Sequence, residues 1–175
     1  MTTRTKFIDN LAFAKKNDHL IDELLLVDCP RLNDFLHHFS LMSTSNMLPS
    51  GLIHYELLGE TDAAGRPFLH LTLAANLITI CQRCLNEMPL KFALNFKYLI
   101  GEVGDFDLMA PEGDGSDDYD MQQVSSNMDI VALVEDEIIM AMPIAPTHEQ
   151  LCGEIVSQSG GEPNPFAILK GLIKP

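Results

Sequence analysis

The chain has 175 residues, 46% hydrophobic and 21% charged, which predicts one globular domain with a sizeable core. It contains no apolar run of about 18 residues, and its first ten residues lack a signal-peptide stretch, so we expect a cytoplasmic protein that does not enter a membrane. The net charge is −14, and no Lys or Arg lies between Lys97 and Lys170, where 15 of the 25 acidic residues fall. This surface repels phosphates and suits a basic partner, although a solvated acidic surface that only aids solubility is an equally good interpretation.

Short elements are predicted along the N-terminal part of the chain. Asp9 or Asn10 is a suitable N-cap for a first helix, because both side chains accept hydrogen bonds from free backbone N–H groups. Pro30 suits the first turn of a second helix. The predicted elements are a helix over Leu11–Lys16, a strand over Ile21–Val27 and a helix over Leu32–Phe39.

The middle of the chain alternates apolar and polar residues with period two. In one run Leu69, Leu71 and Leu73 share a face, and in another Leu90 to Tyr98 carries apolar residues opposite polar ones. This alternation predicts an antiparallel meander with one buried side. Its strands are expected over Leu52–Leu58, Pro67–Ile80 and Leu90–Tyr98.

The last third of the chain is predicted to contain a loop, a short edge strand and one long helix. Gly104–Asp120 is rich in Gly, Asp and Pro, which predicts a mobile acidic loop. Met121–Ser125 is the edge-strand candidate. Ser126 and Asp129 form a capping-box pattern before a helix over Ile130–Met142, which Pro143 ends.

These elements together predict an α+β fold. Strands followed by helices, without regular alternation, favour this class over a doubly wound sheet. We expect a single domain over residues 1–157, with an antiparallel, barrel-like meander packed by a few helices. Residues 158–175 are predicted to be a linker and a short helical tail.

A Cys-x-x-Cys motif, Cys81-Gln-Arg-Cys84, lies in the predicted turn between two strands, where a zinc knuckle places two thiolates on one side. His148 and Cys152 offer two further ligands, which would complete a Cys3His zinc site. Arg83 would stabilise thiolates if they form. The alternative is that the two cysteines are small apolar side chains in a turn, unconnected to His148 and Cys152.

Enzyme templates find little support in the sequence. A thioredoxin-like redox pair needs a helix after its cysteines, whereas Pro89 and an alternating run follow Cys84. The chain has no glycine-rich phosphate loop, no Gly-x-Ser-x-Gly elbow and no His-Glu-x-x-His motif. Glu135, Asp136 and Glu137 are adjacent helical residues that point in different directions, so they cannot converge on one metal. We therefore expect a protein that is not an enzyme.

Four blocks of the sequence resemble the YceD family, the large ribosomal RNA subunit accumulation proteins of bacteria. They are Cys81-Gln-Arg-Cys84, Leu133–Pro143 continuing to Pro146, His148 with Cys152, and Pro163-Asn-Pro-Phe-Ala-Ile-Leu-Lys170. The resemblance implies a non-enzymatic ribosome-biogenesis factor that is needed for the synthesis, processing or stability of large-subunit (23S) rRNA.

With this resemblance, we expect the protein to bind a basic ribosomal protein or an assembling large-subunit particle. Acidic side chains would match the charge of such a partner, and the tail would supply an apolar anchor. The tail could instead fill a groove on its own domain. The side chains expected to contact the partner are Glu135, Asp136, Glu137, Phe166 and Leu169.

Direct binding to rRNA through a zinc-knuckle turn is the alternative. Arg83, Lys91 and Lys97 would form its local basic patch. Binding of this kind weakens steeply with salt, because it depends on the release of counterions from phosphates.

Overall fold

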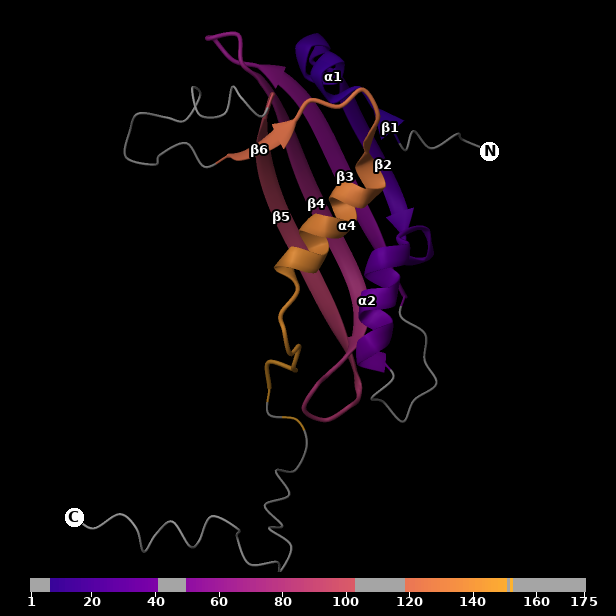
Figure 1. Ribbon diagram of the computed structural model, residues 1–175. Helices are drawn as coiled ribbons and strands as arrows, with labels where there is room; N and C mark the ends of the chain where they lie inside the picture. The colour runs from indigo at the N-terminus through magenta and orange to yellow at the C-terminus, as the bar shows by residue number, and fades with distance from the viewer. Residues whose placement is uncertain (1–6, 41–49, 103–118, 151, 153–175) are drawn as a thin grey trace, which may run out of the picture.

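One open five-stranded sheet, covered by helices on one face, makes up the fold (Figure 1). The computed structural model describes residues 7–40, 50–102, 119–150 and 152. The strand order follows the chain, with antiparallel pairs from β2 to β5 and a parallel pair between β5 and β6. The strands are β2 (His19–Leu25), β3 (Ser50–Thr61), β4 (Pro67–Ile80), β5 (Glu87–Gly101) and β6 (Asp120–Gln123).

Three helices and a small second sheet complete the described part of the chain. The short strand β1 pairs with β7 just before the long helix α4. A 3-10 turn, η1, joins β2 to α2. The bounds are β1 (Phe7–Ile8), α1 (Asn10–Lys16), η1 (Leu26–Asp28), α2 (Pro30–Ser40), β7 (Met128–Asp129) and α4 (Ile130–Ala141).

The predicted α+β fold with a single domain and an antiparallel meander is confirmed. The barrel-like form of the sheet is wrong, because β2 and β6 lie at opposite edges and do not pair with each other. The predicted edge strand at Met121–Ser125 appears as β6. The predicted strand over Ile21–Val27 ends earlier, at Leu25, where η1 begins.

The core lies between the sheet and the helices. Leu69, Leu71 and Leu73 of β4 are buried on the helix-facing side, and the apolar partners of β5 lie beside them in register. Leu32 and Leu36 of α2 recur at helical spacing and pack on the same core. Each fully buried leucine stabilises the fold by about 1.5–3 kcal/mol relative to an exposed one.

Side-chain caps fix where the helices begin. Asp9 caps α1 by accepting a hydrogen bond from the Ala12 N–H at 2.8 Å. Asn10 is buried, and its side chain bonds the backbone at the end of β6, at Gln123 and Ser125. Asp129 caps α4, accepting from the N–H groups of Val131 and Ala132. The predicted capping box is therefore wrong in detail, because Asp129 and not Ser126 is the N-cap of α4.

Two predicted segments lie largely outside the described residues. Only Tyr119 and Asp120 of the predicted acidic loop are described, and Asp120 opens β6. The tail over 158–175, with Phe166 and Leu169, lies wholly outside. Among the described helices, none is long and apolar enough to cross a membrane.

Candidate metal centre

The turn between β4 and β5 presents the Cys-x-x-Cys motif. It closes through two backbone hydrogen bonds, from the Cys81 N–H to the Asn86 carbonyl and from the Leu85 N–H to the Cys81 carbonyl, each 2.9 Å long. Leu85 has a φ of 59°, in the left-handed region, which reverses the chain after Cys84. The turn thereby holds Cys81 and Cys84 on one side.

The chain after α4 returns to this turn. Pro143 ends the helical region, and the following segment runs alongside the turn, where the Gln82 N–H donates to the Pro146 carbonyl at 2.8 Å. The His148 ring reaches the first residue of β5, with its Nε2 3.1 Å from the Glu87 carbonyl oxygen. These contacts bring His148 and Cys152 to the two cysteines of the turn.

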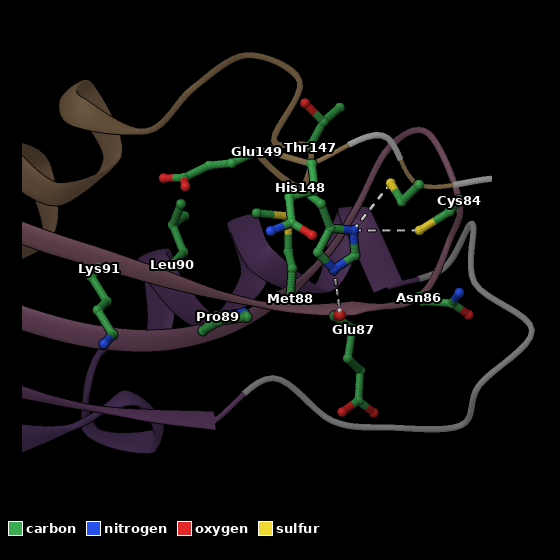
Figure 2. A pocket seen from close by; sticks show the side chains of 12 residues that line it. Cys84, Asn86, Glu87, Met88, Pro89, Leu90, Lys91, Thr147, His148 and Glu149 are labelled. Carbon is green, nitrogen blue, oxygen red and sulfur yellow. Dashed lines mark hydrogen bonds between the residues drawn. The ribbon is translucent and has the colours of Figure 1, made fainter.

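The four candidate ligands meet in one cluster, defined here as Cys81, Cys84, His148 and Cys152. One ligand atom from each lies within 4.8 Å of all the others. His148 Nδ1 lies 3.2 Å from Cys152 Sγ and 3.5 Å from Cys84 Sγ (Figure 2). The sulfurs of Cys81 and Cys152 are 3.5 Å apart. The two halves of the Cys3His set are therefore adjacent in the fold.

The orientation of the imidazole suits a ligand. Its Nε2–H donates to the Glu87 carbonyl, which leaves Nδ1 to face the three sulfurs. Metal-binding histidines use their second nitrogen in this way, and the hydrogen bond fixes both the tautomer and the ring plane. Nothing in the sequence pattern identified Glu87, because its backbone carbonyl and not its side chain makes the contact.

Arg83 closes the other side of the cluster. Its Nε and Nη2 each lie 3.2 Å from Cys152 Sγ, and Nη2 also donates to the carbonyls of His148 and Gln150. The expected role of Arg83 as a thiolate partner thus has a direct geometric basis. Three thiolates around one divalent ion would leave a net negative charge, which the guanidinium balances.

Hydrogen bonds favour the ionised form of two of the thiols. Burial alone raises the pKa of Cys81, but backbone N–H groups of Cys84, Arg83 and His148 outweigh it and lower the pKa to about 5. Burial also raises the pKa of Cys152, yet Arg83 and His148 lower it overall.

The other two ligands have raised pKa values. In Cys84 the Asn86 N–H lowers the pKa, but burial and the neighbouring sulfurs together raise it. The pKa of His148 is raised chiefly by its hydrogen bond to Cys152. Metal binding requires deprotonated thiols and a neutral imidazole, so a bound ion would displace the protons that these groups share.

The geometry fits a tetrahedral metal ion. With Zn–S bonds of about 2.3 Å, tetrahedral sulfurs lie roughly 3.8 Å apart, close to the separations in the cluster. Three sulfurs and one imidazole nitrogen are a common structural zinc set, and all four positions are filled by protein. The cluster could therefore hold a metal ion without leaving a position open for catalysis.

A groove of about 780 Å³ adjoins the cluster. Figure 2 shows it between the first residues of β5 and the segment that carries His148. Met88 and Leu90 provide apolar surface, and Glu87, Glu149 and Lys91 are the charged residues among the described lining.

The three predicted partner-binding acids of α4 have different surroundings. Glu135 is 2% exposed, and its carboxylate accepts the N–H groups of Arg31 and Leu32 at the start of α2. Glu135 therefore joins two helices and is not available to a partner in this structure. Asp136 is exposed and paired with Arg31, and Glu137 accepts a 2.7 Å hydrogen bond from the Tyr98 hydroxyl.

The three cations of the predicted RNA-binding patch are dispersed. Arg83 is engaged in the cluster, and Lys97 places its Nζ 4.5 Å from the centre of the Phe68 ring. Lys91 and Lys97 are six residues apart on β5, about 20 Å along the strand. Arg66 also packs on Phe68, so the cations do not gather around the turn.

Comparison with known proteins identifies the family. A family model described as "Large ribosomal RNA subunit accumulation protein YceD" matches residues 69–173, more than half of the chain. A curated relative of the same description, from Haemophilus influenzae, is 30% identical over 102 residues, which cover 53% of this chain and 57% of the relative. No solved structure matches the chain. On the strength of the family match, which contains both halves of the Cys3His cluster, the chain belongs to the YceD family.

Proposed function

We propose that this protein is a non-enzymatic cytoplasmic factor needed for the accumulation of large-subunit (23S) rRNA. The match to the YceD family over residues 69–173 carries this proposal, because the family and its Haemophilus influenzae member are both described by that role. We propose that the protein acts by binding a basic ribosomal protein or an assembling large-subunit particle.

Charge supports a basic protein partner over naked rRNA. The three arginines that the structure describes, Arg31, Arg66 and Arg83, are each engaged with Asp136, Asp62 or the sulfur cluster. A phosphate ligand would have to displace these contacts. The acids of the last third of the chain, by contrast, are complementary to a basic surface.

Depletion of the protein tests the biological role. We expect the ratio of large-subunit to small-subunit rRNA to fall, and wild-type protein supplied in trans to restore it. Association with purified large-subunit proteins, assayed at low and moderate salt, tests the mode of action. Enrichment of naked 23S rRNA with a steep salt dependence, and of no protein, would favour the direct RNA-binding alternative.

We further propose that one zinc ion occupies the Cys3His cluster and has a structural role. The support is the donor set itself, with four ligand atoms within 4.8 Å and an imidazole oriented by Glu87. Zinc would tie the β4–β5 turn to the chain after α4. Metal analysis of protein purified without chelator should give one zinc per chain, whereas Cys84→Ser should lower this content sharply.

The matched control for Cys84→Ser is a cysteine outside the cluster. Cys29 is buried beside α2 and does not belong to the four-residue group. Cys29→Ser should therefore keep one zinc per chain. Equal metal contents in the wild type and Cys84→Ser would contradict the zinc proposal.

A further inference from the structure

Among the described residues, the edge of β5 that faces away from β4 has no strand beside it over most of its length. β5 pairs with β4 from Glu87 to Leu99, but on its other side β6 pairs only with Tyr98–Gly101. Figure 1 shows β6 at one end of β5, and the segment that carries His148 lies beside the other end, at Glu87. Among the described residues, the stretch 88–97 between them has no strand on this side, and we call it the β5 edge.

Three observations fix which backbone groups point outward from the β5 edge. The Glu87 carbonyl accepts from His148, and the Gly101 carbonyl accepts from Val124, so both point away from β4. Pro89 has no N–H to donate, as expected at a residue whose backbone groups point away from β4. In an antiparallel pair these directions alternate. Lys91, Ala93 and Asn95 therefore direct their N–H and C=O groups into the open edge.

The side chains along the β5 edge form an apolar stripe on the helix-facing side. Four large residues there pack on the core but are only half-buried, although residues of this size at matching positions of β4 are fully buried. A strand added beside β5 would cover them. The stripe consists of Leu90, Phe92, Leu94 and Phe96.

Carboxylates lie at both ends of the β5 edge. At one end Glu87 and Glu149 line the groove. At the other end Asp120 pairs with Tyr98 across β5 and β6, and Glu137 accepts the Tyr98 hydroxyl. The edge is thus apolar along its middle, and at each end two carboxylates lie near one lysine, Lys91 or Lys97, which leaves an excess of negative charge.

We propose that the β5 edge is a docking site for an extended segment of a basic protein, which adds to the sheet as a strand in line with β6. This inference rests on the proposed function and specifies how the partner binds. Backbone groups of Lys91, Ala93 and Asn95 pair with the segment, and apolar side chains at alternate positions cover the stripe.

The chemistry of the segment follows from the same surface. Basic residues suit its two ends, where the carboxylates lie. On the other face of the sheet, basic residues are unfavourable at the positions directly beside Lys91 and Lys97. Apolar residues at alternate positions with basic flanks are therefore the expected pattern.

The test uses purified large-subunit ribosomal proteins, assayed one at a time against the full-length chain. Ala93→Pro removes one outward N–H but none of the hydrogen bonds to β4. Pro89 shows that β5 accepts a proline at an outward position of this kind. We expect it to weaken binding of the recognised protein by about tenfold or more. Circular dichroism and metal content check that the variant folds.

A matched control exists on the opposite edge of the sheet. Ile21 of β2 is 66% exposed, and the Gly59 N–H to Asp18 carbonyl bond shows that odd-numbered residues of β2 point outward. Ile21→Pro should leave the affinity within about twofold, because it removes an outward N–H on the edge that the partner does not contact. In the wild-type chain, hydrogen exchange should slow on binding at Lys91, Ala93 and Asn95, but not at Ile21.

Each outcome has a distinct meaning. If a basic protein binds wild type and Ala93→Pro equally, without protection of the three amides, the β5 edge is not its site, although the proposed function stands. Loss of binding in Ile21→Pro alone would move the site to β2. If light scattering shows a dimer that Ala93→Pro dissociates, a second copy fills the edge. If no large-subunit protein binds, the docking site and the proposed binding of a basic ribosomal protein both fail, whereas the role in rRNA accumulation is decided by depletion.

Discussion

Three adjacent acids of α4 have three different environments, and the environment decides what each one contributes. Glu135 is buried against the start of α2, Asp136 lies in an exposed ion pair, and Glu137 is half-buried below Tyr98. Residue type and helical spacing predict that the three diverge, but not which one turns inward, because that depends on where α2 packs.

Replacing Glu135 should be costly. Glu135→Ala leaves the N–H groups of Arg31 and Leu32 without their acceptor, and each buried unsatisfied donor costs about 1–3 kcal/mol. We expect the free energy of unfolding in urea to fall by roughly 2–4 kcal/mol. Asp136→Ala, which breaks only an exposed pair, should cost less than about 1 kcal/mol. Similar losses for both would contradict the capping role of Glu135.

Glu137 gives a pH-dependent prediction. Burial is the main cause that raises its pKa, Asp120 and Asp136 raise it further, and the Tyr98 hydroxyl opposes them. Because the folded state favours the protonated acid, stability from this group is full below its usual pKa and is lost as the pH rises through the raised value. Glu137→Gln keeps an oxygen acceptor for Tyr98 without the charge.

The expected result is a difference between Glu137→Gln and the wild type that grows with pH. At pH 4 and below the two should unfold at similar temperatures, whereas at pH 7 the variant should be more stable by less than about 1 kcal/mol, because the side chain is partly solvated. Thermal unfolding across this pH range provides the measurement. A variant that is less stable at pH 7 than at pH 4, relative to wild type, would show that the carboxylate is favoured by the fold.

At the scale of elements, local patterns predict the sheet well and its edges poorly. The period-two alternation over Pro67–Ile80 coincides with β4, because both neighbours of this central strand bury the same face. The parallel pairing of β6 with β5 was not predicted, since four residues carry no signal for their partner. The C-terminal end of β2 was predicted at Val27 instead of Leu25 for a similar reason, because Leu26 and Val27 are as apolar as the strand before them.

The contact between α1 and the sheet depends on a glycine that the alternation does not identify. A Cβ at Gly59 of β3 would lie 2.4 Å from the Phe13 carbonyl oxygen and 2.9 Å from the Ala14 Cα. Both atoms belong to the backbone of α1, so the helix would have to move away. The absence of a side chain therefore sets the distance between α1 and β3.

Gly59→Ala should accordingly destabilise the protein by about 1–3 kcal/mol, as overpacked core substitutions do. Gly65→Ala is the comparison, because Gly65 has a φ of +80° but no atom within 4 Å of the added Cβ. Its cost should be about 1 kcal/mol and come from the left-handed backbone alone. Urea unfolding of both variants gives the values, and a smaller loss for Gly59→Ala than for Gly65→Ala would contradict the close packing of α1.

At the scale of the whole molecule, the cluster joins parts of the chain that are more than sixty residues apart. The sequence predicts all four ligands from their chemistry, yet it leaves their meeting open, because that depends on how α4 crosses the sheet. The fold brings the end of α4 back to the β4–β5 turn through the Gln82–Pro146 and His148–Glu87 bonds. Both bonds end on a backbone carbonyl, so they could not be inferred from residue types.

If the proposed zinc ion is bound, its removal should loosen one end of the molecule and leave the sheet in place. The main core is built from β3, β4, α2 and α4, and of the four ligands only Cys81 is fully buried. A strong chelator should therefore preserve the circular dichroism of the sheet while it lowers the unfolding temperature by several degrees, since a bound ligand stabilises only the folded state. Hydrogen exchange should accelerate in the turn over 81–86 and in 146–150, and not at Leu71 in the centre of β4.

Cys29→Ser should respond as the wild type does, whereas Cys84→Ser should show fast exchange in both segments before chelator is added. Unchanged exchange at the turn after the metal has been removed would mean that the backbone contacts, and not the ion, hold this end of the fold together.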